Sequence, residues 1–124
     1  MSDLLVVGGG KMGEALVGGL LGAGGWSAAA ITIVEPDAAR RAELAGAFPG
    51  LQVVDEPVAA AAAIVAVKPQ QVVGVCTSLG PLGVGRVLSI AAGVRLASME
   101  AVLPAGTAVV RAMHSCVAPN APSG

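Results

Sequence analysis

The residues of this 124-residue chain with the clearest chemical purpose are those at positions 8–13, which read GGGKMG. This G-x-G-x-x-G spacing is typical of a loop that holds the diphosphate of a dinucleotide. Gly8 permits a tight turn, Gly10 lets the diphosphate approach the backbone, and Gly13 lets the following helix pack against the preceding strand. The free N–H groups and positive dipole end of that helix then bind the phosphates. A purely structural turn is the alternative, since the chain has 18 glycines, but the apolar run before the motif and the helical pattern after it favour cofactor binding.

An acidic residue follows the glycine motif at the distance expected of a group that hydrogen-bonds the adenosine ribose. This residue is Glu35, at the end of a second apolar run. Its charge favours NAD over NADP, because a carboxylate repels a 2′-phosphate. Arg40 and Arg41 follow one helical turn later and offer such a phosphate a partner, whereas the alternative for both is a solvated helix face. The residues by themselves leave the choice between NAD and NADP open.

Two later segments end apolar runs, where a parallel sheet places its ligand crevice. Residues 66–69 read AVKP; the proline sets the direction of the chain, and a lysine that leaves a buried strand needs water or an anion. Residues 90–93 read IAAG, and such small side chains suit a position where a nicotinamide ring approaches the backbone. Each segment taken separately is also compatible with an ordinary strand end.

Other residue types that carry chemistry are few. Cys76 and Cys116 lie far apart without metal-type spacing, and His114 is the only histidine, so we expect neither a disulfide framework nor a metal site. We interpret His114 and Cys116 as non-catalytic, because nothing supports the geometry that such a pair requires. No general acid, base or nucleophile can be assigned, and the catalytic residues stay unknown.

The chain alternates short apolar runs with helix-like stretches, which predicts an α/β fold with a Rossmann-like, doubly wound parallel sheet of about six strands. One dinucleotide-binding domain is expected over residues 1–113, followed by a loop-like tail over 114–124. Strands are predicted at 4–7, 31–34, 51–54, 63–67, 87–91 and 107–110. Helices are predicted at 12–23, 36–48, 58–62, 70–79 and 96–103. In the second of these helices, Leu44, Ala45 and Phe48 are expected to face inward.

Composition excludes several classes of protein. Hydrophobic residues make up 55% and charged residues 12%, which excludes intrinsic disorder. The charge-free run 15–34 has the length of a bilayer span, but its glycine pairs indicate a buried helix, a turn and a buried strand instead. A net charge of −1 predicts no binding to nucleic acid or to an anionic membrane. With 2% aromatic residues, the core must consist of Ala, Val, Leu and Ile. The N-terminus does not read as a signal peptide, so we expect a cytoplasmic protein.

Four blocks of the sequence, at 8–16, 65–70, 89–94 and 109–113, resemble pyrroline-5-carboxylate reductase, an oxidoreductase of proline biosynthesis, and stand in the order of that family. The resemblance covers residues 1–113. It implies hydride transfer from NADP (or NAD) to the C=N carbon of 1-pyrroline-5-carboxylate, which gives L-proline. It also implies cofactor-binding roles for Val7, Gly8, Gly9, Gly10, Lys11, Met12, Gly13, Glu35, Ala66, Val67, Lys68, Pro69, Ile90, Ala91 and Ala92.

The chain departs from the family pattern after residue 113. Residues 114–118 stand before a Pro-Asn-x-Pro sequence at 119–122 that directly follows the last strand in family members. Full-length members are homo-oligomers, and they continue into a helical domain that dimerises and supplies the substrate pocket; we expect this domain to be missing from the chain. The alternatives to a reductase cofactor domain are a non-catalytic dinucleotide-binding module, a truncated gene product, or a reductase related to β-hydroxyacid dehydrogenases.

Overall fold

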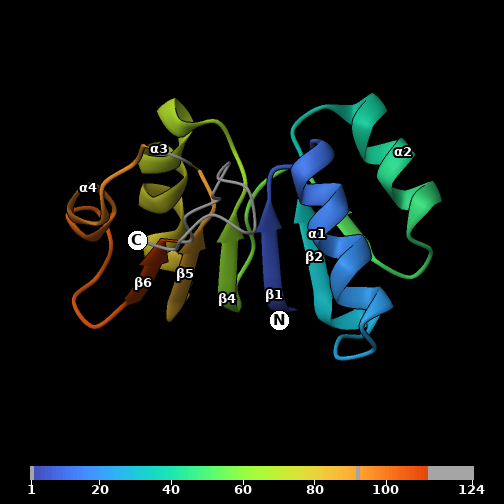
Figure 1. Ribbon diagram of the computed structural model, residues 1–124, viewed down its shortest axis with the longest axis horizontal. Helices are drawn as coiled ribbons and strands as arrows, with labels where there is room; N and C mark the ends of the chain where they lie inside the picture. The colour runs from blue at the N-terminus through green and yellow to red at the C-terminus, as the bar shows by residue number, and fades with distance from the viewer. Residues whose placement is uncertain (1, 92, 112–124) are drawn as a thin grey trace, which may run out of the picture.

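The computed structural model describes residues 2–91 and 93–111, which form one open parallel sheet with helices on both faces (Figure 1). The predicted tail over 114–124 and the predicted site residue Ala92 lie outside the described residues. The α/β class and the parallel sheet agree with the prediction from the sequence.

Six strands lie in the order β3-β2-β1-β4-β5-β6, and every neighbouring pair is parallel. This is the order of the dinucleotide-binding doubly wound fold. The direction in which successive strands are added to the sheet reverses between β1 and β4, and such folds open a ligand crevice at this point. The strands are β1 (Ser2–Val7), β2 (Ile31–Val34), β3 (Gln52–Val54), β4 (Ala60–Val65), β5 (Arg86–Ser89) and β6 (Ala108–Arg111).

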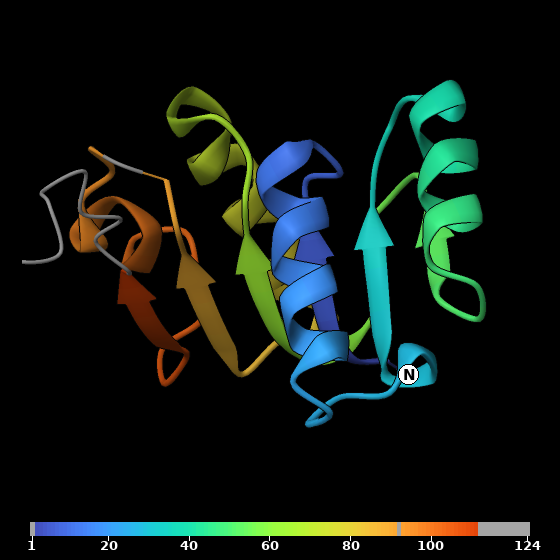
Figure 2. The ribbon, with the colours of Figure 1, turned by 45° about the vertical axis from the view of Figure 1, so that its right-hand side comes forward.

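Helices cover the two faces of the sheet separately (Figure 2). On one face, Val17 of α1 and Leu44 of α2 pack against side chains of β1 and β2. On the other face, α3 and α4 contribute Val72 and Met99 to a second cluster with β1, β4 and β5. The helices are α1 (Lys11–Gly22), α2 (Ala38–Ala47), α3 (Pro69–Leu79) and α4 (Leu96–Glu100), with short 3-10 turns η1 (Ala28–Ala30) and η2 (Gly80–Leu82).

Burial follows the predicted aliphatic pattern. All four residues of β2 are buried, which a parallel strand covered on both faces requires. The run 15–34 that had the length of a bilayer span consists of α1, η1 and β2. Within the described part of the chain, no helix is long and apolar enough to cross a membrane.

The helix predicted over 58–62 is wrong. Ala60–Val65 is instead the central strand β4, in which Ala62 pairs with Leu4 of β1 and with Arg86 of β5. Alanine favours helices by itself, but pairing with two neighbouring strands overrides that weak preference. The connection over residues 55–59 therefore crosses the sheet without a helix, and Val58 packs against the core on the α3 side.

Smaller differences concern the ends of elements and one side chain. β4 ends at Val65 and β5 at Ser89, so residues 66–67 and 90–91 leave the sheet earlier than predicted. In α2, Leu44 is buried and Phe48 half-buried as expected, but Ala45 is exposed. The early ends matter for the site, because they free the backbone beyond β4 to line a cleft.

Candidate functional site

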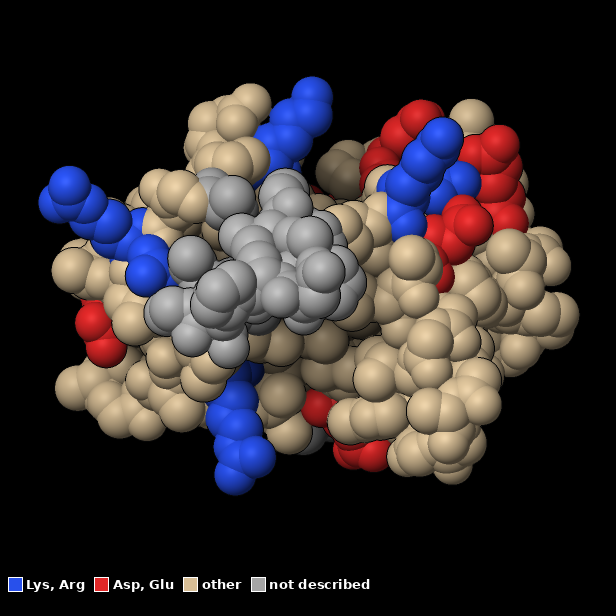
Figure 3. All heavy atoms as spheres, viewed as in Figure 1, with Lys and Arg blue, Asp and Glu red and all other residues tan. Residues whose placement is uncertain are grey.

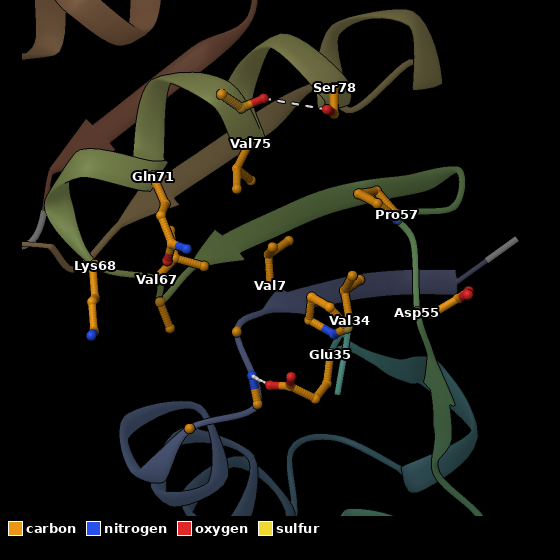
Figure 4. A pocket seen from close by; sticks show the side chains of 16 residues that line it. Val7, Val34, Glu35, Asp55, Pro57, Val67, Lys68, Gln71, Val75 and Ser78 are labelled. Carbon is orange, nitrogen blue, oxygen red and sulfur yellow. Dashed lines mark hydrogen bonds between the residues drawn. The ribbon is translucent and has the colours of Figure 1, made fainter. Parts of the chain in front are cut away.

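A cleft of about 690 Å³ opens at the carboxyl ends of β1, β2 and β4 (Figure 4). Its volume lies in the range of cofactor sites, roughly 300–1,000 Å³. The loops after β1, β2 and β4 lie at the same edge of the sheet, because Val7 is level with Val34 and with Val65. The lining residues are Val7, Gly8, Gly9, Gly10, Val34, Glu35, Pro36, Asp55, Pro57, Ala66, Val67, Lys68, Gln71, Gly74, Val75 and Ser78.

The cleft brings together eight of the residues predicted from the sequence: Val7, Gly8, Gly9, Gly10, Glu35, Ala66, Val67 and Lys68. Six other predicted residues do not line it. Four of these stand in the first turns of α1 and α3, and two follow β5: Lys11, Met12, Gly13, Pro69, Ile90 and Ala91.

Sequence reasoning missed eight lining residues, most of which carried a readable signal. Gln71, Gly74, Val75 and Ser78 repeat at the spacing of one helix face directly after the predicted Lys68. Asp55 follows the end of β3, where a parallel sheet places ligand contacts. The remaining missed residues are Val34, Pro36 and Pro57.

Gly8 makes the tight turn that the motif predicts. Its φ of 113° lies in the region that favours glycine, and its N–H donates to the Val34 carbonyl oxygen at 3.0 Å. A Cβ at this position would stand 2.7 Å from the Ala66 carbonyl oxygen. Gly8 therefore allows the loops after β1 and β4 to touch.

We expect Gly8→Ala to lower the free energy of unfolding by about 2–4 kcal/mol, since it combines an unfavourable φ with a backbone clash. Urea unfolding of the wild-type and Gly8→Ala proteins measures this difference in the free energy of unfolding. Gly25→Ala is the matched control, because a Cβ at Gly25 meets nothing within 4 Å. Equal stability of the Gly8 and Gly25 variants would contradict the steric role of Gly8.

Gly10 and Gly13 have opposite surroundings. A Cβ at buried Gly13 would overlap the Gly8 carbonyl oxygen, so α1 packs against the loop as the motif predicts. A Cβ at Gly10 would meet nothing within 4 Å. The space beside Gly10 is therefore open to a ligand, although the chain itself would tolerate a side chain there.

Gly9 has a role that the motif does not specify. Its N–H donates to Oε1 of Glu35 at 3.1 Å. A Cβ would stand 2.7 Å from Cδ1 of Leu44 and 2.8 Å from Oε1 of Glu35. The second position of G-x-G accepts many residues in general, so no sequence signal identifies this close packing.

Glu35 lies at the end of β2 and lines the cleft, where the sequence placed it (Figure 4). Both carboxylate oxygens accept backbone hydrogen bonds, Oε1 from Gly9 and Oε2 from Asp37 at 2.8 Å. Asp37 in turn caps α2 by accepting from the Ala39 N–H at 3.2 Å. The carboxylate is thus held in one orientation at the edge of the cleft.

Arg40 and Arg41 are half-buried, and neither lines the cleft. Nε of Arg40 donates to the Gly9 carbonyl oxygen at 2.6 Å, and Nη2 donates to Glu14 at 2.7 Å. The hydrogen bond to Glu14 raises the pKa of the Arg40 guanidinium, which keeps it protonated. Nη1 of Arg41 donates to the carbonyl oxygens of Glu35 and Pro36 at 3.0 and 2.7 Å. Both arginines therefore turn toward the protein, unlike side chains of a solvated helix face.

Two helices begin at the cleft without a side-chain cap. Gly10 precedes α1 and Lys68 precedes α3, and neither helix start has a capping side chain among the described residues. The first N–H groups of a helix lack partners within it and carry a partial positive charge. Figure 3 shows basic and acidic side chains gathered over the starts of α1 and α2. The cleft can therefore hold an anionic ligand between the two helix starts.

Groups for metal binding or nucleophilic chemistry are scarce in the described part of the chain. No cluster of His, Cys, Asp and Glu there could hold a metal ion. Cys76 is free but buried in the core, and burial raises the pKa of its thiol. His114 and Cys116 lie outside the described residues.

Comparison with curated proteins finds several pyrroline-5-carboxylate reductases. The enzyme of Pseudomonas aeruginosa is 39% identical over 123 residues, which cover 94% of this chain and 42% of that protein. The enzyme of Pasteurella multocida is 35% identical over 131 residues, which cover 98% of this chain and 45% of that protein. The chain thus spans less than half the length of these relatives.

Solved structures agree on the fold. A pyrroline-5-carboxylate reductase from Coxiella burnetii matches with a TM-score of 0.78 and 26% identity over 90% of this chain and 43% of that one. Plasmodium falciparum pyrroline carboxylate reductase, solved with NADP bound, has a TM-score of 0.68 at 18% identity and covers 89% of this chain and 41% of that one. These matches confirm the Rossmann-like fold and the resemblance to pyrroline-5-carboxylate reductases.

A family model that matches most of the chain shows the family to which the chain belongs. Residues 3–93 match the family described as "NADP oxidoreductase coenzyme F420-dependent". This stretch contains the glycine loop, Glu35 and the loop after β4, all of which line the cleft, and it also contains the end of β5. The chain belongs to this family of NADP oxidoreductases.

Proposed function

We propose that this chain is the NADP(H)-binding domain of a pyrroline-5-carboxylate reductase. The observation that carries the proposal is the open space beside Gly10 at the uncapped start of α1, within the crevice between β1 and β4. Diphosphate groups bind at such helix starts because N–H groups and the helix dipole point at them. The relatives named above support the substrate class.

In this proposal the cofactor extends across the cleft from Glu35 to the loop after β4. The N–H groups at the start of α1 hold the diphosphate, and Glu35 marks the adenosine ribose end. Lys68 supplies a positive charge beside Ala66 and Val67, at the end of the cleft that we assign to the nicotinamide. The roles of Pro69, Ile90, Ala91 and Ala92 at the nicotinamide end stay predictions from the family resemblance. When bound, NADPH supplies the hydride; this chain supplies its binding and orientation.

In this proposal the complete reaction belongs to a longer protein, of the kind that the curated relatives represent. A hydride adds to the C=N carbon of 1-pyrroline-5-carboxylate and a proton adds to its nitrogen, which yields L-proline. We propose that the part of such a protein beyond the matched residues supplies the substrate pocket. The same part would form the contacts between the subunits of a homo-oligomer. A cytoplasmic location stays a prediction.

We propose NADP rather than NAD, in agreement with the description of the family and with the NADP-bound Plasmodium protein. The charge of Glu35 opposes this choice, because its carboxylate is held at the ribose end of the cleft. Two unit charges about 5 Å apart interact by roughly 1–3 kcal/mol, depending on the local dielectric.

Glu35→Gln is therefore expected to raise the ratio of NADPH to NADH affinity by about fivefold. Glutamine keeps an oxygen that accepts from Gly9 and removes the negative charge. Isothermal titration calorimetry with both cofactors measures the ratio. Asp55→Asn is the matched control, since it removes a carboxylate elsewhere in the cleft. An unchanged ratio in Glu35→Gln would place the 2′-phosphate away from Glu35.

The direct test of the proposed function is calorimetric titration of the 124-residue chain with NADPH. We expect saturable binding of one NADPH per chain. A chain that is folded by circular dichroism and binds neither NADPH nor NADH would contradict the proposal. An assay of proline formation by the longer protein tests the substrate class separately.

A further inference from the structure

Arg40 connects three parts of the molecule next to the proposed cofactor site. It stands on α2, and its Nε donates to the carbonyl oxygen of Gly9 in the glycine loop at 2.6 Å. Its Nη2 pairs with Glu14 of α1 at 2.7 Å, and its Nη1 lies 3.4 Å from Glu43 of α2. The guanidinium is only partly exposed, with a side-chain accessibility of 24%. Such a fork of charge-assisted hydrogen bonds is directional, because the guanidinium group is planar.

The bond to Gly9 determines where the next amide points. A trans peptide unit is planar, so the N–H of Gly10 points opposite to the C=O of Gly9. Arg40 draws that carbonyl oxygen toward α2, and the Gly10 N–H therefore points away from α2. Glu35 holds the preceding N–H of Gly9 at the same time. Gly9 is thus held by both of its backbone polar groups.

A clamp is needed here because residues 8–10 are all glycine. Glycine populates more backbone conformations than any other residue, so a loop of three glycines loses the most entropy when it adopts one shape. Without Arg40, the carbonyl oxygen of Gly9 loses the side-chain donor that fixes the orientation of the peptide unit between Gly9 and Gly10. A rotated unit would direct a carbonyl oxygen, instead of an N–H, away from α2.

The charge of Arg40 is already matched by two carboxylates. Glu14 lies in the first turn of α1, where a free carboxylate would repel a phosphate group. Its ion pair with Arg40 offsets that repulsion, and Glu43 approaches the same guanidinium. Arg40 also does not line the cleft. It is therefore placed to act on the loop rather than on a 2′-phosphate.

We propose that Arg40 is a positioning residue for the cofactor diphosphate: by holding the Gly9 carbonyl oxygen and neutralising Glu14, it presents the N–H groups at the start of α1 to the ligand. This inference rests on the proposed function. It differs from both roles that the sequence offered for Arg40, which were a partner of the 2′-phosphate and part of a solvated helix face. NADPH and NADH share the diphosphate and differ in the 2′-phosphate, so their affinities distinguish the two roles.

The test is calorimetric titration of the 124-residue chain and of Arg40→Met with NADPH and with NADH. We expect the affinities for both cofactors to fall by about tenfold, with the ratio between them unchanged, since one charge-assisted hydrogen bond to the loop is lost. A loss confined to NADPH would assign Arg40 to the 2′-phosphate and overturn the inference. Unchanged affinities for both cofactors would overturn it as well.

Two further variants complete the experiment. Arg41→Met removes the same charge from the neighbouring position without touching Gly9, and it is expected to leave NADH affinity within twofold of wild type. An equal loss of NADH affinity in Arg41→Met would show a general charge effect and overturn the inference. Arg40→Lys keeps the charge but cannot bridge Gly9 and Glu14 as a fork, so the same parallel loss is expected if Arg40→Met does not fold. A wild-type chain that binds neither cofactor would overturn the proposed function and the inference together, whereas the other adverse results overturn the inference alone.

Discussion

Gly10→Val is expected to abolish NADPH binding by the 124-residue chain, with an affinity loss of at least about 100-fold. The branched side chain would occupy the space beside Gly10 that the proposed site leaves for the diphosphate, at the start of α1. Among the described residues, apart from the two chain neighbours, no atom lies within 4 Å of a Cβ there, and the φ of −74° suits any L-residue. The fold is therefore expected to persist. Calorimetric titration measures the affinity, and circular dichroism with urea unfolding measures the fold.

Gly25→Val is the matched control for Gly10→Val. Gly25 also has no atom within 4 Å of a Cβ, and it lies in the turn after α1, away from the cleft. We expect this variant to bind NADPH within twofold of wild type. Equal NADPH affinity of the wild-type and Gly10→Val chains would remove the glycine loop from the proposed site.

The 124-residue chain is expected to form no proline above a protein-free control when supplied with NADPH and 1-pyrroline-5-carboxylate. Hydride transfer needs the reacting atoms held roughly 3–3.5 Å apart in an aligned geometry, and much of the rate comes from that positioning. The walls of the cleft come from the loops after β1, β2, β3 and β4 and from one face of α3, all of which belong to the cofactor domain. Glu35, one of the carboxylates that line it, is held by two backbone N–H groups. Residues 2–91 and 93–111 supply no further wall that would hold a substrate against a nicotinamide ring.

Spectrophotometric loss of NADPH together with detection of proline measures this turnover. The Pseudomonas aeruginosa reductase, of which the matched region is 42%, serves as the positive control for the assay. Turnover of the 124-residue chain near a kcat of about 10 s⁻¹, an ordinary value for an enzyme, would contradict the expectation. Such a result would require a pocket formed by self-association of the chain.

Several parts of the fold followed from the sequence because their signals are local. The strand over Ile31–Val34 was predicted with its observed bounds, since four consecutive β-branched residues favour a strand, here one buried on both faces. The turn at Gly8 and the packing at Gly13 followed from the spacing of the motif, and at Gly13 the close neighbour is Gly8, five residues earlier in the chain. Glu35 was placed at the cleft by its position at the end of a strand. The parallel order of strands followed from the alternation of strands and helices.

Other features were decided only by the tertiary structure. Ala60–Val65 became a strand because β1 and β5 pair with it on both sides, and this pairing outweighs the helix preference of alanine. The close packing at Gly9 arises from Leu44 and Glu35, which lie on other elements. Arg40 turns from the solvent to the Gly9 carbonyl oxygen, 31 positions earlier in the chain, because packing of α1 and α2 on the same face of the sheet brings the two together. Local spacing sets which backbone conformations are available, but contacts between distant segments choose the partners, and only the folded chain contains those contacts.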